Sequence, residues 1–381
     1  MRLVPPVGVL LVALCPRVLS TEQVRVWDGQ TVSTSLPRDV APAGRTLIIE
    51  HSFEPAIESR LKLAAGNSSI SLNLGARSEL VAELRAHAAG RQEATVALLR
   101  RRSSEHLRFK GFWICNCMAV WGATPALERE LKELNGVTNV REQRYAYIPE
   151  GDGGDGVAAD GLEKADLEWN IKITAADKVW QQADVTGQGV VVGTIDTGVR
   201  HTHEAMRDHY RGADHSWFDA EGTEPPRWPN GPSETPFDNN GHGTHVAGTL
   251  SGTHGIGVAP GADWITCKAF DSSGQGAEPH LLMCGEFMGC PTKWDGSDED
   301  CTLGVNVLSN SWGFSCGGCT GEGDPLQRMT QTWRALGIYT TFAAGNSVRG
   351  RLRAYTHSLP FVYNVRILQG GVCGYRGKRW R

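Results

Sequence analysis

The chain has 381 residues, of which 40% are hydrophobic and 21% are charged, and its formal net charge is −4. This composition is typical of a globular protein and excludes a mostly disordered chain. The length allows two or three domains. The near balance of acidic and basic residues gives no reason to expect a nucleic-acid partner. No apolar run reaches the roughly 20 residues of a membrane-spanning helix.

Residues 1–20 have the pattern of a secretory signal peptide. Arg2 gives a positive start, residues 7–15 are mostly apolar, and the small side chains of Val18 and Ser20 suit the cleavage site. A buried N-terminal strand is the weaker alternative, because two adjacent prolines interrupt the stretch. We therefore expect a secreted, extracellular protein.

The chain contains 10 cysteines. Export to an oxidising compartment favours disulfides, although their connectivity does not follow from sequence. The pair Cys316 and Cys319 is compatible with zinc or redox chemistry, but disulfide-linked surface loops over residues 284–319 are the better interpretation. The acidic run 295–300 offers oxygen ligands to a structural calcium ion, although such runs are more often simply solvated.

Residues 46–150 are predicted to form a small ferredoxin-like α+β domain, after a loosely ordered lead-in at 21–45. The expected elements are a strand at 46–53, a helix at 78–102, a strand or hairpin at 107–120, a helix and a last strand at 137–148. The second helix is the best marked, because Thr124 can cap it, Pro125 suits its first position and Gly136 ends it.

A flexible, glycine-rich junction at 151–161 separates this domain from a second pattern at 162–346. Continuous apolar strands are expected at 190–195, 264–270, 305–310 and 339–344, with helices starting near 246 and spanning 281–288 and 326–336. Uninterrupted apolar strands are typical of a parallel sheet that is buried on both faces. The alternation therefore predicts an α/β fold.

Three segments of this region carry chemically active side chains. Asp196 ends a buried strand in Gly-Thr-Ile-Asp-Thr-Gly, His242 opens a helix in Gly-His-Gly-Thr-His, and Asn346 ends another strand in Phe-Ala-Ala-Gly-Asn. Sites in open α/β sheets lie outside the carboxyl ends of the strands. We therefore expect these three side chains to converge.

Each of these residues has an alternative interpretation. Asp-Thr-Gly is also the aspartic-protease motif, but that chemistry needs two carboxylates and no second motif exists. His242 and His245 could bind a metal one helical turn apart, yet further ligands are not evident. The glycines at 187–189 resemble a dinucleotide loop but precede their strand. Asn346 alone could be a turn residue.

In this order, the three segments resemble the subtilisin-like serine proteases, and the motifs at 178–180, 257–260 and 310–313 place the chain near the bacillopeptidase-F-like branch. The resemblance covers about residues 165–346, and residues 46–148 resemble the inhibitory propeptide of the family. It implies a doubly wound parallel sheet of the subtilisin type. It also implies a secreted serine endopeptidase that acts on protein or peptide substrates and is inhibited by its own propeptide.

The resemblance also implies roles for individual residues. His242 would be the general base, Asp196 would orient its imidazole, and Asn346 would donate its amide to the oxyanion. The backbone of Ser311, Trp312 and Gly313 would pair with the substrate as an added strand. This chemistry requires no cofactor.

The Gly-Thr-Ser-Met-Ala segment that carries the nucleophile in this family does not occur in the sequence, and the basic tail 347–381 has no clear pattern. We therefore expect a catalytic domain that is incomplete at its C-terminus and inactive as given. The alternative function is that of a non-catalytic protein that binds peptides or inhibitors.

Overall fold

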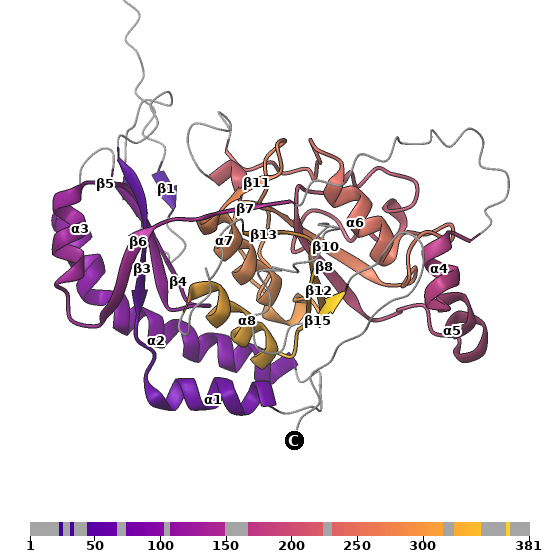
Figure 1. The fold of residues 1–381 in the computed structure, drawn as a ribbon, viewed down its shortest axis with the longest axis horizontal. Coiled ribbons are helices and arrows are strands. Elements are labelled where there is room, and N and C mark those ends of the chain that lie inside the picture. Colours follow the sequence, from indigo (N-terminus) through magenta and orange to yellow (C-terminus); the bar gives the residue numbers. More distant parts are fainter. Residues whose placement is uncertain are drawn as a thin grey trace, which may run out of the picture. The chain divides into compact units, whose positions relative to one another are not determined.

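The computed structural model describes residues 44–66, 74–102, 107–148, 167–223, 231–314 and 324–343, and the three short strands β1 (Gln23–Arg25), β2 (Thr31–Ser33) and β15 (Tyr363–Val365) (Figure 1). The chain forms two compact units, Met1–Pro37 and Arg38–Arg381. In the first unit, β1 and β2 pair in an antiparallel manner, where the sequence predicts only a loose lead-in. The predicted signal peptide, the junction at 151–161, Asn346 and the basic tail, apart from β15, lie outside the described residues.

The second unit begins with an antiparallel α+β region, as predicted. Its four-stranded sheet has the order β4-β5-β3-β6. In chain order its elements are β3 (Arg45–His51), α1 (Pro55–Gly66), α2 (Leu74–Arg101), β4 (Arg108–Phe112), β5 (Cys117–Ala123), α3 (Pro125–Lys132) and β6 (Val137–Glu142).

The structure confirms the predicted hairpin and adds one helix that was not predicted. The stretch predicted as a strand or hairpin at 107–120 is a hairpin of β4 and β5. Helix α1 was not predicted, although Pro55 occupies its first position and Ile57 and Leu61, spaced four residues apart, are both buried. The predicted cap of α3 is confirmed, since the hydroxyl of Thr124 accepts a hydrogen bond from the Leu127 amide at 3.2 Å.

The remainder of the unit is built on a parallel sheet with the strand order β15-β14-β12-β8-β10-β9. Its strands are β8 (Val191–Asp196), β9 (Trp217–Asp219), β10 (Asp263–Lys268), β12 (Val307–Asn310) and β14 (Tyr339–Ala343), joined by β15. The helices are α4 (Trp169–Thr174), α5 (Ala176–Ala183), α6 (His242–Ser251), α7 (Glu278–Gly289) and α8 (Pro325–Ala335), with 3₁₀ turns at Arg207–His209, Glu221–Thr223 and Cys301–Leu303. The four predicted strands are confirmed to within a few residues, whereas the three-residue β9 was missed.

Helices cover both faces of this sheet, which makes it doubly wound. On one face, Val192 and Trp264 pack with Ala247 of α6. On the other face, Ile195 and Leu308 belong to a larger apolar cluster that includes residues of α7 and α8. Helix α6 begins at His242, in the glycine-rich turn that was expected to open a helix. Within the described residues, no helix combines the length and the apolar character that crossing a bilayer requires.

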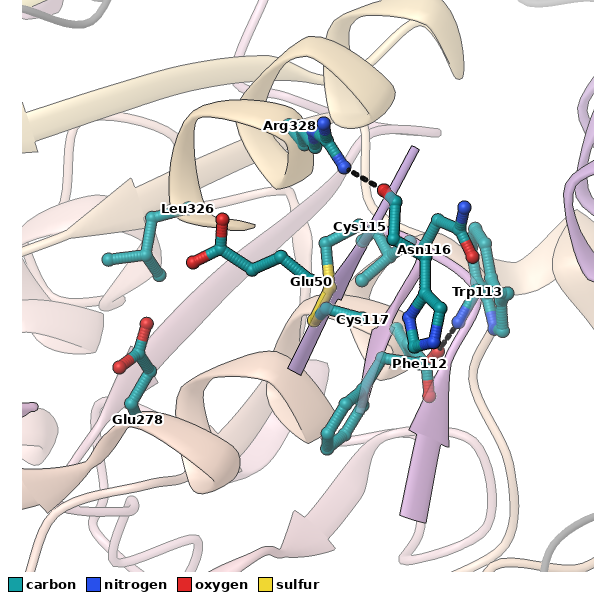
Figure 2. Close-up of a disulfide and its surroundings, with 12 residues drawn as sticks. Glu50, Phe112, Trp113, Cys115, Asn116, Cys117, Glu278, Leu326 and Arg328 are labelled. Atoms are coloured by element: carbon teal, nitrogen blue, oxygen red, sulfur yellow. Dashed lines mark hydrogen bonds between the residues drawn. A yellow bond between two sulfur atoms is a disulfide. The ribbon is translucent and has the colours of Figure 1, made fainter. Parts of the chain in front are cut away.

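The α+β region packs directly against α7 and α8 through the tip of the β4–β5 hairpin. The backbone amide of Trp113 donates to Glu286 of α7 at 2.7 Å, and Thr332 of α8 donates to the carbonyl of Ile114 at 2.9 Å. A disulfide joins Cys115 and Cys117 at this tip, close to the start of α8 (Figure 2). Both cysteines are completely buried, so the tip forms part of a shared core.

Two further disulfides lie in the α/β region and correct the expected loop. Cys267 of β10 is joined to Cys284 of α7, and Cys290 to Cys301. Because α7 is buried up to Gly289, the cross-linked loop begins at Cys290 and not at 284. Cys316 and Cys319, the last two cysteines of the predicted loop, lie outside the described residues.

The last predicted strand, at 137–148, is in fact two strands. The chain leaves the four-stranded sheet after Glu142, and β7 (Tyr145–Tyr147) becomes the middle strand of a second, three-stranded sheet with β11 (Gln275–Ala277) and β13 (Gly313–Phe314). Arg144, which lies between the two strands, forms ion pairs with Glu278 and Asp324, which are far away in the sequence.

Candidate active site

Asp196 is the last residue of β8, which lies near the centre of the parallel sheet between β10 and β12. Its side chain is 1% exposed. One carboxylate oxygen, Oδ1, accepts a hydrogen bond from the backbone amide of Thr197 at 2.8 Å. The sheet thus holds a buried carboxylate at the carboxyl end of a rigid strand, which is where ligands bind in folds of this class.

His242 is the first residue of α6 and meets this carboxylate. Its Nδ1 lies 2.8 Å from Asp196 Oδ1. Gly241, with a φ of 101°, makes the sharp turn that brings the imidazole to the sheet, because other residues rarely adopt this left-handed conformation. The structure therefore brings two of the three predicted residues together. Asn346 lies outside the described residues, and the catalytic roles of all three stay predictions.

Asp238 organises the turn that precedes His242, and sequence analysis missed it. Its Oδ1 accepts hydrogen bonds from the amides of Asn240 and Gly241 at 3.0 and 2.8 Å, and its Oδ2 accepts from the amide and hydroxyl of Thr244 at 2.9 and 2.6 Å. Burial alone would raise the pKa of Asp238, but these donors outweigh it and hold the pKa below its usual value. The signal in the sequence was an Asp three residues before a glycine-rich turn.

The protonation of His242 is set by the same carboxylates. Burial disfavours the imidazolium, but the hydrogen bond and charge of Asp196, helped by the charge of Asp238, raise the pKa of His242 above its usual 6.5. The predicted role of His242 as a general base requires such a contact, because a carboxylate on one ring nitrogen holds the imidazole in one tautomer.

Backbone segments approach each other closely around this pair. A Cβ atom on Gly243 would lie 2.1 Å from the carbonyl oxygen of Gly198 and 3.1 Å from Asp196 Oδ1. Position 243 therefore requires glycine, because the atoms that would obstruct a Cβ there are mainly backbone atoms, which cannot rotate away.

We expect Gly243→Ala to destabilise the protein by about 1–3 kcal/mol and to separate His242 from Asp196, because the added methyl group overpacks this contact. Urea unfolding measures the first effect and the NMR titration of His242 the second. Gly90→Ala, on an open position of α2, is the control and should be neutral or slightly stabilising. A His242 pKa that is unchanged in Gly243→Ala would contradict the prediction.

Lys268 is a second residue that sequence analysis missed. It lies opposite Asp196 in the β8–β10 pairing and is completely buried. Its ammonium donates to the carbonyls of Thr197 and Phe270 at 3.0 and 2.6 Å and to Asn239 Oδ1 at 2.9 Å. The ammonium of Lys268 thereby connects the turn that follows Asp196 with the turn that precedes His242. The available signal was a Lys inside the otherwise uncharged run 264–270, which was predicted as a strand.

The strip between β11 and β13 is filled by the protein's own chain. Tyr147 of β7 lies opposite Gln275 on one side and Gly313 on the other, in antiparallel pairing. The amide of Ile148 donates to the carbonyl of Gly274 at 2.9 Å, which extends the pairing. Gly313, which was predicted to pair with an extended peptide, therefore pairs with a segment of residues 46–150.

The other two residues predicted to line this strip lie just before β13. Trp312 is 3% exposed and packs edge-on against Phe314 and Phe342. Ser311 is partly buried beside it. The pairing of their backbone with a substrate stays a prediction.

Among the described residues, one group has the spacing of a metal site, namely Cys290, Glu299 and Cys301. The two cysteines form a disulfide, and Glu299 pairs with Arg85. The acidic run 295–300 satisfies part of its charge locally, since Asp295 accepts hydrogen bonds from the amide and hydroxyl of Ser297. A structural calcium ion there stays a prediction.

Comparison with known proteins extends these observations. The sequence model of the subtilase family matches residues 187–372. Bacillopeptidase F of Bacillus subtilis (strain 168) is 36% identical over 205 residues, which make up 50% of this chain and 13% of bacillopeptidase F. The intracellular serine protease of Paenibacillus polymyxa is 36% identical over 207 residues, or 53% of this chain and 55% of that protein.

The fold has a counterpart among solved structures. The epidermin leader peptide processing serine protease of Staphylococcus aureus aligns with 84% of this chain and 69% of its own, with a TM-score of 0.53 and 15% identity. This chain spans less than two thirds of the length of either curated relative. The sequence match places residues 187–372 in the subtilase family of serine peptidases, and the solved structure shows the same fold.

Proposed function

We propose that this chain is a secreted serine endopeptidase of the subtilisin type, in which His242 is the general base and Asp196 orients it. The observation that carries the proposal is the 2.8 Å contact between His242 Nδ1 and the buried Asp196 carboxylate. In peptide-bond hydrolysis, His242 would take the proton of a serine hydroxyl and later give it to the leaving amine. Asn346 would donate its amide to the oxyanion.

The substrate would bind as a strand between β11 and β13. The position of β7 supports this, because an extended peptide already pairs there on both sides. Main-chain pairing of this kind supplies affinity that is independent of the side chains. We infer that residues 46–150 act as an intramolecular inhibitor, since β7 occupies the strip that a substrate would need.

Export is part of the proposal. The signal-like pattern at 1–20 and the three disulfides are together consistent with folding in an oxidising compartment. The chemistry needs no cofactor.

The test uses two polypeptides, residues 21–381 and the same residues joined to a C-terminal segment that contains Gly-Thr-Ser-Met-Ala. We expect the first to neither hydrolyse a general peptide substrate nor react with a serine-directed fluorophosphonate, because no Gly-Thr-Ser-Met-Ala segment occurs in it. The second should do both. Stoichiometric labelling of residues 21–381 at any serine would contradict the assignment of the missing nucleophile.

A second candidate function is binding without catalysis. The observation in its favour is that the strip is filled while no Gly-Thr-Ser-Met-Ala segment occurs in the 381 residues. A joined polypeptide that still binds peptides in the strip but shows neither turnover nor labelling would favour it.

A further inference from the structure

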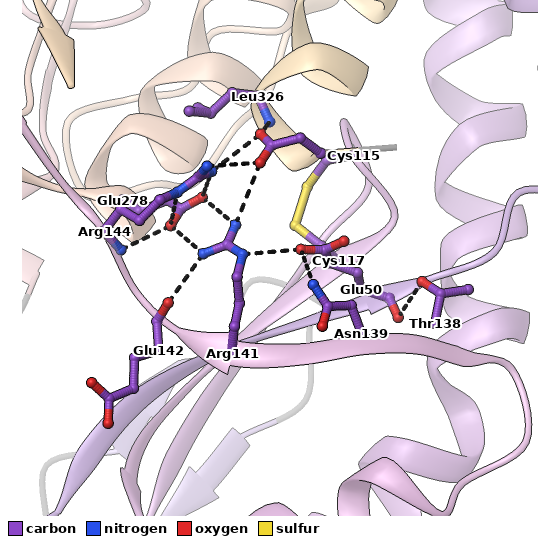
Figure 3. Close-up of polar contacts among 11 residues, drawn as sticks. Glu50, Cys115, Cys117, Thr138, Asn139, Arg141, Glu142, Arg144, Glu278 and Leu326 are labelled. Atoms are coloured by element: carbon purple, nitrogen blue, oxygen red, sulfur yellow. Dashed lines mark hydrogen bonds and ion pairs between the residues drawn. A yellow bond between two sulfur atoms is a disulfide. The ribbon is translucent and has the colours of Figure 1, made fainter. Parts of the chain in front are cut away.

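We propose that Glu278 and Asp324 form a binding site for an arginine side chain, and that the protein uses it to select peptides with Arg directly before the segment that lies between β11 and β13. In the structure the site is occupied by Arg144, the residue before β7 (Figure 3). The inference rests on the proposed function, because it takes the strip between β11 and β13 to be the substrate site.

The two carboxylates are held in place by the helices that carry them. Glu278 is the first residue of α7, and Asp324 caps α8, where its Oδ1 accepts from the Leu326 amide at 3.0 Å. Glu278 is 0% exposed and Asp324 is 9% exposed. Helix N-termini favour negative charge, so both carboxylates are stabilised at these positions.

Arg144 meets this site through nearly every polar atom that it offers. Its Nε and Nη2 donate to the two oxygens of Glu278 at 3.3 and 2.6 Å, and its Nη2 donates to Asp324 Oδ1 at 3.1 Å. Its Nη1 lies 2.7 Å from Asp324 Oδ2. The guanidinium also lies over the ring of Phe314, 5.2 Å from its centroid. This forked geometry suits arginine and not lysine, which offers only a point charge.

The main chain fixes which residue of a bound peptide reaches the site. The Glu278 amide donates to the carbonyl of Arg144 at 3.0 Å, and the Arg144 amide donates to Glu278 Oε2 at 3.0 Å. These bonds continue the pairing of β7 with β11, in which Tyr145 lies opposite Ala277. A peptide in the same register therefore places the side chain directly before its paired segment at Glu278.

Arg141 also pairs with Glu278, but it is held by a second carboxylate in the four-stranded sheet. It donates to both oxygens of Glu278 at 2.8 and 2.7 Å, and also to Glu50 of β3 at 3.1 Å. Burial alone would raise the pKa of Glu278, but Arg141 and Arg144 outweigh it and keep its pKa below the usual value. Without these cations, Glu278 would be a buried and unpaired carboxylate, which is costly. A substrate arginine would remove that cost.

The first test measures the affinity between the two parts of the protein. A specific protease site is introduced at 151–156 and cut, and the dissociation constant of the two fragments is measured by fluorescence anisotropy. Arg144→Met should raise it at least about 30-fold, because truncation removes one of the two arginines that pair with Glu278 and leaves Asp324 without its nearest cation. Arg144→Lys should recover part of the loss. Arg102→Met, which removes an exposed partner of Glu130 in the same fragment, is the matched control and should change it less than threefold.

A double-mutant cycle shows whether the effect of Arg144 on the affinity depends on Glu278. In a Glu278→Gln background, Arg144→Met should cost less than about fivefold. An Arg144→Met loss no greater than that of Arg102→Met, or an equal loss in both backgrounds, would overturn the proposal.

The second test uses both fragments without any substitution and adds synthetic peptides as competitors. The peptide of residues 141–148, Arg-Glu-Gln-Arg-Tyr-Ala-Tyr-Ile, should displace the labelled N-terminal fragment at a concentration at least tenfold lower than a peptide with neutral citrulline in place of Arg144. Equal potency would contradict the arginine site. A polypeptide with the added serine segment that discriminates the two peptides without any turnover would refute the proposed function and leave this site standing.

Discussion

Asp196→Asn is expected to lower kcat by about 10⁴ in the polypeptide that carries the added serine segment. Loss of the aspartate from such a triad leaves the histidine in the wrong tautomer, with no charge to stabilise the imidazolium. The structure gives both effects a cause, because the Asp196 carboxylate lies 2.8 Å from His242 Nδ1 and is 1% exposed.

The same substitution changes the titration of His242, which can be measured by NMR without any turnover. Because Asp196 raises the pKa of His242, the interaction stabilises the fold fully below pH 6.5, the ordinary pKa, and this stabilisation is lost as the pH rises through the raised pKa. In Asp196→Asn the pKa should fall and this pH dependence of stability should disappear.

Asp263→Asn is the matched control for both measurements. Asp263 begins β10 at the opposite end of the same sheet and is partly exposed. It should change kcat and the His242 pKa little. An effect of Asp263→Asn as large as that of Asp196→Asn would show that the loss reflects the sheet and not the pair.

Lys268→Met is expected to destabilise the protein by about 3–5 kcal/mol, the usual cost of leaving a buried ionic partner uncompensated. The ammonium lies 3.1 Å from Glu221 Oε2, and the side chain of Glu221 is only 13% exposed. Methionine keeps the volume of the stem but cannot donate to Thr197, Asn239 or Phe270.

Urea unfolding measures this loss as a lower midpoint. Lys172→Met, on an exposed position of α4, removes the same charge from the surface and should change the free energy of unfolding by less than about 0.5 kcal/mol. If Lys268→Met unfolds at the same midpoint as Lys172→Met, the buried cation does not hold the two turns together.

The parts of the fold that were predictable are those whose cause is local. The run at 190–195 is apolar and β-branched, which requires a strand that is buried on both sides, and the structure has β8 there. Thr124 favours the capping position of a helix and Pro125 its first position, and α3 starts there. The contact between Asp196 and His242 was also foreseeable, because strand ends and glycine-rich turns meet at one edge of such a sheet.

The parts that were not predictable depend on distant residues. The strand β6 ends at Glu142, and two residues later Arg144 forms hydrogen bonds with Glu278 and Asp324, which lie 134 and 180 positions away in the sequence. No local sequence pattern indicates such a distant partner. Lys268 is a similar case, since its acceptors lie on three different turns and only the folded structure shows why a charge is tolerated in the strand.

The most direct test of the Asp196–His242 assignment is the pH dependence of fluorophosphonate labelling in the polypeptide with the added serine segment. A general base must be deprotonated to act, so the labelling rate should rise with pH along a single titration whose midpoint equals the His242 pKa measured by NMR. It should fall to background in His242→Ala. A labelling rate that does not depend on pH and is unchanged in His242→Ala would contradict the account.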